Sequence, residues 1–375
     1  MDITFETYIK NLLNEKHNGI ADELIVHSHL LQYLIKKTKP ADKDESKARK
    51  SFANLYAILV LVEDYRSVIE RHEDYSKYQG AQFSPLLEKA RSYPFGQKIQ
   101  NHAFNNRMND EFFKFFPLQK DEGMFPIMRN LKTKRYWINE NYLLVDVNGN
   151  SIDISVDIID IIKHYTEVVK EKLEKFISDC EKLKEIENGC GDQTIGFIEA
   201  LLEPDVDARL FEIVSFSILK YHYHKTIIHW GEDLHNIDHH EHKKLYKTGR
   251  TNANDGGIDF VMKPLGVFFQ VTETLDFKKY FLDIDKIERY PITFVIKSTD
   301  SEESIKAQLE KDAKKKYRVQ SVVDNYMNCI EQVININDLK YFLAELNSEG
   351  KLSEVLDEII TQSKVEFNYE DEEEE

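Results

Sequence analysis

The sequence predicts a mixed α/β protein in which helix outweighs strand. Its 375 residues include only 8 Pro and 14 Gly, and long runs with apolar residues at helical spacing dominate the chain. In the C-terminal half, short apolar or alternating runs bounded by turn residues indicate strands. The order there is helix, three strands, helix, strand, which indicates a mixed central sheet flanked by helices.

Composition narrows the class of protein. Apolar residues make up 41% of the chain, with 22 Phe and 19 Tyr, as in a folded globular protein. The chain has no run of 18 apolar residues and an amphipathic N-terminus, so we expect a cytoplasmic protein without a membrane span. Cys180, Cys190 and Cys329 are odd in number and widely spaced, which indicates reduced thiols and no zinc knuckle.

The charge balance argues at first sight against a nucleic-acid partner. The formal net charge is −17, from 50 basic and 67 acidic residues. Six of these acids form the terminal run Glu370–Glu375, so the rest of the chain carries −11. Two basic clusters weaken the objection, KKLYKTGR at Lys243–Arg250 and KDAKKKYR at Lys311–Arg318. For either cluster a solvated helix face is the alternative interpretation.

The first 190 residues are expected to be mainly helical. The clearest helix covers residues 51–72, where Phe52, Leu55 and Leu59 recur at helical spacing. Another helix can start at Pro85, with Ser84 as its cap.

A β-hairpin interrupts these helices at residues 135–156. Two alternating runs meet there at Asn148 and Gly149, a pair suited to a tight turn with positive φ angles. A long helix follows from about residue 157 to residue 184, with a broad apolar stripe that fits a core helix or a subunit contact.

The second half divides into a core at residues 191–347 and a C-terminal part at residues 348–375, which we expect to be a helix followed by a disordered acidic tail. The core begins with a helix after Pro204, capped by Asp205 or Asp207. The later elements are two strands joined by a turn at Lys263–Gly266, a helical stretch at 276–290, a strand at Pro291–Lys297, a helix at 301–328, a strand at Gln332–Ile336 and a helix capped by Asp338.

One stretch of this core places several polar residues close together. NDGGIDFVMKPLGVFFQVTE, from Asn254 to Glu273, begins its first apolar strand with Asp259. Gln270 and Thr272 lie two residues apart in the next strand and therefore share a face. The short turn folds the second strand back on the first, so we expect Asp259 beside Gln270.

This stretch resembles the PD-(D/E)XK nuclease superfamily, to which most type II restriction endonucleases belong. GGIDF and FFQVTE carry most of the resemblance, which covers residues 191–346 and extends to the order of the elements. An ordinary hairpin with its polar residues in solvent is the alternative. The Gly-Gly pair before Asp259 and the apolar flanks of both strands favour the nuclease core.

The resemblance implies a magnesium site and assigns its ligands. Asp259 matches the metal-binding aspartate of the family, and Gln270 stands where most members have Glu and the Mrr-like branch has Gln. The backbone carbonyl of Val271 and the carboxylate of Glu212, on the first core helix, would complete the set. Hydrolysis of a phosphodiester uses such a cation to offset charge and to acidify the attacking water.

The sequence departs from the family at Thr272, where most members have the catalytic lysine. Lys297, at the end of the third strand, is our candidate for its replacement. Lys263, Lys278 and Lys279 are alternatives, and Glu273 is a candidate base.

Candidate DNA-binding residues lie in both halves. The amide-rich segment QNHAFNNRMND includes Asn101, Asn105, Asn106 and Arg107, and such side chains can pair with base edges. A buried polar network is the alternative. Near the nuclease-like stretch, the candidates are Lys247, Arg250 and Asn252.

Seven of the 13 histidines fall between His222 and His242, where we expect a loop. Four acids lie among them, so a His-cluster metal hydrolase is a rival hypothesis. The spacing matches neither HExxH nor a closed zinc site, and a polar loop beside DNA is the alternative.

Together these features predict a magnesium-dependent, sequence-specific endonuclease that cuts double-stranded DNA, most similar to type II restriction enzymes. A palindromic site needs two active sites, so we expect a homodimer. The main alternative is a nuclease fold that binds DNA without cutting it.

Overall fold

The computed structural model describes residues 4–39, 48–97, 99–185, 191–233, 235–249 and 258–367. Over these residues it contains fifteen α-helices, one five-stranded sheet and several small sheets and hairpins. The prediction of a mixed α/β protein dominated by helix is therefore confirmed. None of the described helices is both long enough and apolar enough to cross a membrane.

The chain divides into two compact units, residues 1–175 and residues 176–375. The division falls inside the long helix α8 (Ser155–Glu185). The sequence analysis expected the boundary at residue 190. Residues 186–190 lie outside the described residues.

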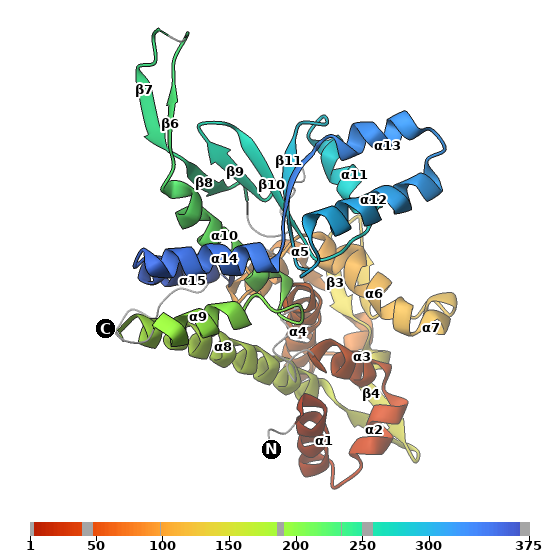
Figure 1. Cartoon of the computed structure of the whole chain (residues 1–375). Coiled ribbons are helices and arrows are strands. Elements are labelled where there is room, and N and C mark those ends of the chain that lie inside the picture. Colours follow the sequence, from red (N-terminus) through yellow and green to blue (C-terminus); the bar gives the residue numbers. More distant parts are fainter. Residues whose placement is uncertain are drawn as a thin grey trace. The chain divides into compact units, whose positions relative to one another are not determined.

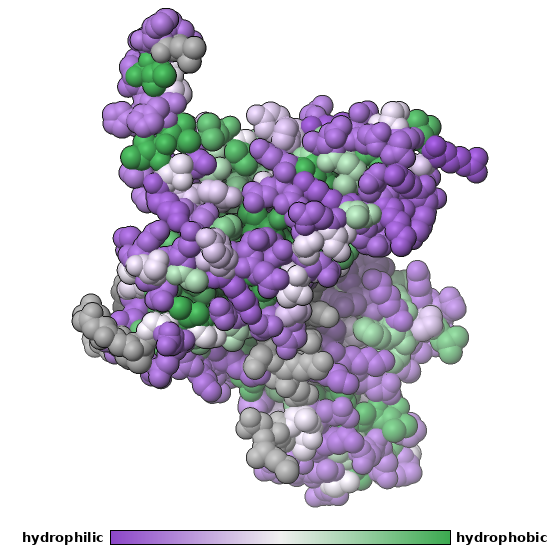
Figure 2. Space-filling view, viewed as in Figure 1, coloured by the Kyte–Doolittle hydropathy of each residue, from purple (hydrophilic) through white to green (hydrophobic). Residues whose placement is uncertain are grey.

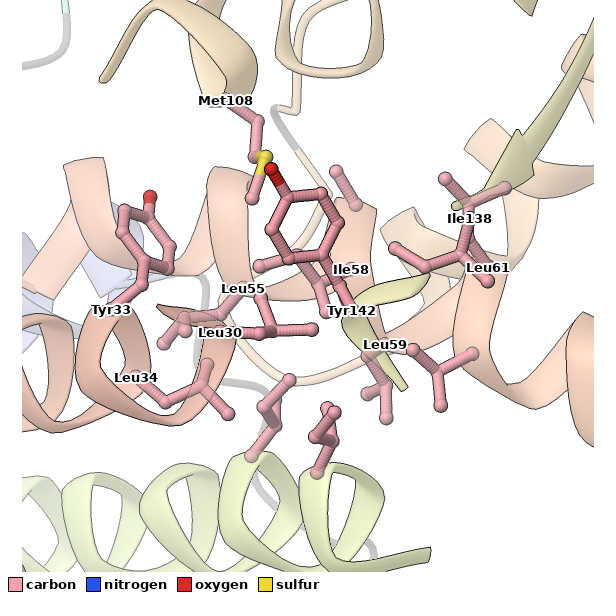
Figure 3. Packing of buried hydrophobic residues seen from close by; sticks show 14 of the residues in the cluster. Leu30, Tyr33, Leu34, Leu55, Ile58, Leu59, Leu61, Met108, Ile138 and Tyr142 are labelled. Carbon is pink, nitrogen blue, oxygen red and sulfur yellow. The ribbon is translucent and has the colours of Figure 1, made fainter. Parts of the chain in front are cut away.

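The first unit is a helical bundle built around α4, and its core is shown in Figure 3. Residues Phe52 to Val62 of α4 are almost entirely buried, because other elements of the unit cover this helix on all sides. The α-helices of the unit are α1 (Phe5–Lys16), α2 (Ala21–His27), α3 (His29–Thr38), α4 (Ala48–Glu70), α5 (Phe83–Ser92), α6 (Met108–Phe115), α7 (Pro117–Asp121) and the first part of α8.

The expected hairpin at residues 135–156 is only half right. Strands β4 (Leu144–Val147) and β5 (Asn150–Asp153) pair across Asn148 and Gly149, whose φ angles are 55° and 80°. The earlier run, β3 (Arg135–Ile138), instead joins β2 (Ile127–Asn130) and β1 (Ala81–Gln82) in a separate sheet. A turn at Glu140–Tyr142 separates β3 from β4, so the two runs belong to different ladders.

The helix expected at Pro85 begins two residues earlier than predicted. Gln82 is the N-cap of α5 and makes no side-chain cap bond, and Pro85 is the third helical residue. Ser84 is therefore not the cap. Proline is tolerated at this position because the backbone N–H groups of the first turn have no helical partner.

The second unit is built on the five-stranded sheet. Its strands are ordered β12 (Ile330–Ile334), β11 (Ile292–Ile296), β10 (Val267–Thr272), β9 (Phe260–Lys263), β8 (Lys244–Lys247). Strand β9 pairs antiparallel with both β8 and β10, whereas β10, β11 and β12 are parallel. All five residues of β11 are buried, as expected for a parallel strand covered on both faces.

Helices cover the two faces of this sheet (Figure 1). One face packs on α10 (Ala208–His224), through the contacts of Phe216 with Phe260 and of Tyr223 with Phe269. α9 (Gly191–Ala200), α14 (Ile336–Ser348) and α15 (Leu352–Phe367) pack with α10 in the same layer. The other face packs on α11 (Phe277–Lys286), α12 (Glu302–Lys316) and α13 (Gln320–Met327). We call these two sides the α10 face and the α11 face.

The order of elements expected for the core is present, with several differences in detail. Strand β8 adds a fifth strand, and the helix expected at 301–328 divides into α12 and α13 around Tyr317–Val319. β12 lies two residues earlier than predicted. Asp338 is not the cap of α14, because Asn335 caps it and Asp338 completes the capping box. Asp207 caps α10, as one of the two expected residues. The acidic tail lies outside the described residues.

Candidate active site

Asp259 lies at the start of β9, opposite Gln270 of β10. The register pairs Phe260 with Phe269, so the next residue pair is Asp259 and Gln270. The backbone N–H of Asp259 donates to the carbonyl of Phe269 at 2.9 Å. Its carboxylate Oδ2 accepts a hydrogen bond from the backbone N–H of Val271 at 2.7 Å, which fixes the carboxylate at the end of the strand pair.

Gln270 presents a buried oxygen at the same place. Its Nε2 donates to the backbone carbonyl of Val271 at 3.3 Å, and its Oε1 is buried without a hydrogen-bond donor from any described residue. An unsatisfied buried acceptor costs about 1–3 kcal/mol. That cost is offset if a ligand of positive charge fills the place of the missing donor.

The donor atoms here fit a hard divalent cation. Asp259, Gln270 and Val271 offer a carboxylate, an amide oxygen and a backbone carbonyl on adjacent residues of the two paired strands, and Mg²⁺ prefers oxygen ligands. Within the described ranges, no three His, Cys, Asp or Glu side chains are grouped as metal ligands. Such a group is not required for Mg²⁺, which binds through one or two carboxylates with water and substrate phosphates.

Thr272 shares the face of Gln270 and is almost completely buried, with 2% of its surface exposed. It pairs with Ile296, and Gln270 pairs with Phe294, so both side chains lie on the α11 face. Its hydroxyl accepts a hydrogen bond from the ammonium of Lys279, in the first turn of α11, at 3.2 Å.

Lys297 lies on the other face of the sheet. It follows β11 in alternation with Thr293, which pairs with Phe269 on the α10 face. Its ammonium donates to the carbonyl of Val206 and to Glu273 Oε1, the latter at 3.0 Å. It also lies 6.0 Å from the ring centre of Phe211 on α10.

Glu212 also belongs to the α10 face. Its carboxylate forms an ion pair with Lys247 of β8 at 2.9 Å, and both side chains are largely buried. Lys247 pairs with Phe260 in the sheet, which places its side chain toward α10. Lys247 also lines an open hollow of about 460 Å³ with Lys220 and Lys244, between α10, β8 and α15.

One buried tyrosine on each face of the sheet has a raised pKa. Burial raises the pKa of Tyr223, on α10, to about 12. Burial, with a smaller contribution from Asp283, raises the pKa of Tyr280 on α11 above its ordinary value.

The amide-rich segment of the first unit has both exposed and buried members. Asn101 and Asn106 are exposed, and Arg107 is half-buried with its guanidinium 3.4 Å from His102 Nε2. Asn109 is buried and bonds both the N–H and the carbonyl of Ile127. The side chain of Asn105, and the whole of Arg250 and Asn252, lie outside the described residues.

The histidine-rich segment is a hairpin rather than the expected loop. β6 (Ile227–Trp230) pairs with β7 (His239–His242), and the hairpin projects from the rest of its unit (Figure 1). His229 lies opposite His240, and Trp230 stacks on His239. Its surface is mainly hydrophilic (Figure 2). Most residues of the two strands are exposed, and their sequences IIHW and HHEH have no alternation of apolar and polar residues that would mark them as strands.

The structure thus brings Asp259, Gln270, Val271 and Thr272 together at two adjacent strand ends, and it places Lys297 and the Glu212–Lys247 pair on the opposite face. Lys279 was one of the alternatives to Lys297, the lysine that the sequence analysis chose. No spacing in the sequence distinguished Lys279 from the other candidates. Comparisons with protein-family models, curated proteins and solved structures find no match to this chain.

Proposed function

We propose that this protein is a magnesium-dependent endonuclease of double-stranded DNA, with a PD-(D/E)XK-like core in residues 191–347. The observation that carries the proposal is the buried, unsatisfied Oε1 of Gln270 beside the carboxylate of Asp259. The order of strands and helices around them agrees with that core. Among nucleases of this fold, type II restriction enzymes are the best model, because the helical first unit is large enough to recognise a DNA sequence.

Asp259, Gln270 and the carbonyl of Val271 would hold the cation. When bound, magnesium offsets the charge of the scissile phosphate and makes a neighbouring water more acidic. Hydrolysis joins the oxygen of that water to phosphorus and breaks the bond from phosphorus to the leaving sugar oxygen. The water loses one proton, and the leaving oxygen gains one from solvent.

The closest alternative function is DNA binding without cleavage. Thr272 carries no charge at the position where the family has lysine, and this observation favours the alternative. The His-cluster hydrolase has less support, because its histidines lie in pairs along an exposed hairpin.

Cleavage of long DNA that offers many sequences tests the proposal. We expect the wild type to cut with Mg²⁺ and not with EDTA. Asp259→Ala should lower the rate by at least about 100-fold, since it removes the charged ligand. Asp192→Ala, at an exposed acid of α9, is the matched control and should cut normally.

Two results would contradict the proposal. Wild-type protein that binds DNA and never cuts it, with Mg²⁺ or Mn²⁺, would leave only the binding function. Equal cutting by Asp259→Ala and the wild type would place the active site elsewhere.

A further inference from the structure

We infer that Lys279 supplies the positive charge that Thr272 lacks, and that Thr272 positions it. The inference rests on the proposed nuclease function and names a further residue of its active site. The direct observation is the hydrogen bond of 3.2 Å from Lys279 Nζ to Thr272 Oγ1. The hydroxyl of Thr272 therefore holds an ammonium group on the face of the sheet that carries Gln270.

The helix that carries Lys279 is anchored against this face. The side chain of Asp276 caps α11 by accepting from the N–H of Lys278 at 3.0 Å. Tyr280 is fully buried, and its ring lies 4.4 Å from that of Phe294. Phe294 is the direct neighbour of Gln270 in the parallel pair. The first turn of α11 is thus fixed beside the strand that carries the candidate metal ligands.

Lys279 also has donors left for a substrate. An ammonium has three N–H donors, and Thr272 takes one of them. Among the described residues, no carboxylate lies within ion-pair distance of Lys279, and the residue is exposed at the surface. Its remaining N–H groups can therefore meet a phosphate oxygen or the attacking water.

Two other candidate lysines, Lys297 and Lys263, fit this position less well. Lys297 lies on the α10 face, and its charge is already balanced by Glu273. Lys263 lies at the opposite end of β9 from Asp259, with its ammonium 5.5 Å from the ring centre of Tyr246. Position on the sheet and free charge thus favour Lys279 over Lys297 and Lys263.

A single-turnover cleavage assay with saturating enzyme tests the inference. We expect Lys279→Ala to cut on the order of 100-fold more slowly than the wild type, because one charged donor to the transition state is lost. Lys279→Gln should behave in the same way while keeping the polar contact with Thr272. Lys351→Ala removes an exposed lysine of the same unit and should cut at the wild-type rate.

Two further measurements separate this role from a structural one. The melting temperature, and DNA affinity measured with Ca²⁺, should be nearly unchanged in Lys279→Gln. Adding Thr272→Lys to Lys279→Ala restores a lysine to the strand and should recover a large part of the rate. A residue that only supported the fold would not be rescued in this way.

The outcomes distinguish this inference from the proposed function. Cutting that needs Asp259 but is unaffected by Lys279→Ala and Lys279→Gln would overturn the role of Lys279 and leave the nuclease standing. Loss of cutting in Lys297→Met, with full activity in Lys279→Ala, would assign the role to Lys297 instead. A wild type that never cuts would overturn both proposals.

Discussion

Gln270 carries the geometric feature on which the proposed function rests, a buried amide oxygen without a hydrogen-bond donor from the described residues. Strand β10 is central in the sheet, and its neighbours on both sides fix its register. The side chain of Gln270 is therefore held on the α11 face, where its amide oxygen is buried. A buried oxygen without a donor is a cost to folding, and in the proposed site it would be a ligand for a cation.

Replacing Gln270 by Glu should strengthen metal binding. A second carboxylate beside Asp259 repels it in the absence of metal and attracts a divalent cation more strongly. We expect Mn²⁺ affinity to rise about tenfold, which equals about 1.4 kcal/mol of additional stabilisation by saturating metal. Thermal unfolding with and without MnCl₂ measures the change.

Gln332→Glu is the matched control for this prediction. Gln332 is exposed on β12 of the same sheet, far from the strand ends that carry Asp259. Its substitution should leave the shift with MnCl₂ unchanged. If the two Glu variants responded alike, the metal would not bind at Gln270.

At the scale of elements, α4 shows how aromatic packing stabilises the first unit. Tyr56 and Tyr65 lie on this helix, and Tyr33, Tyr75 and Tyr142 also belong to the surrounding core. Burial raises the pKa of each of these five phenols above the ordinary tyrosine value. They therefore stay neutral in the folded unit at pH values where exposed tyrosines ionise.

This packing should make the protein labile to alkali. Above pH about 10 the unfolded chain releases these phenolic protons and the folded chain does not. The contribution of the raised pKa values to stability is complete below that pH and is lost as the pH rises toward the folded values. Each such tyrosine should lower the unfolding free energy by about 1.4 kcal/mol per pH unit in that range.

An alkaline titration followed by tyrosinate absorbance and circular dichroism measures this effect. Exposed tyrosines should ionise first with the helical signal unchanged, and the buried ones should ionise together with loss of helix. Tyr65→Phe should weaken the pH dependence, whereas Tyr290→Phe, at a half-exposed position, should not. Ionisation of all 19 tyrosines before any loss of helix would contradict the prediction.

At the scale of the whole molecule, the function proposed for the chain requires two copies. One site cuts one strand at a time, and a symmetric recognition sequence is read by a symmetric protein. We therefore expect a homodimer, with twice the 44.1 kDa mass of one chain by light scattering. A monomer at the concentrations at which it cuts both strands would contradict this prediction.

The chain charge of −17 restricts where such a dimer could contact DNA. Phosphate contacts must come from local clusters of cations, because the protein as a whole repels DNA. In the second unit, Lys220, Lys244 and Lys247 line one hollow on the α10 face.

The sequence alone predicted the class of fold, most elements of both units and the adjacency of Asp259 and Gln270. These features depend on periodicity, turn chemistry and short spacing, which are local properties of a chain. The sequence could not separate β3 from the β4–β5 hairpin. Alternation of apolar and polar residues indicates that a segment is a strand, but it does not indicate which strand it pairs with. The sequence also missed the hairpin in the histidine-rich segment, where no apolar pattern marks the strands.

Only the tertiary structure decided which lysine meets Thr272. Lys279 and Lys297 are 7 and 25 residues away from Thr272, and nothing in those spacings ranks them. Strand alternation sends Lys297 to the α10 face, and the packing of α11 returns Lys279 to the face of Gln270. The face of a sheet on which a side chain lies is set by register and by the covering helix, and both are products of long-range packing.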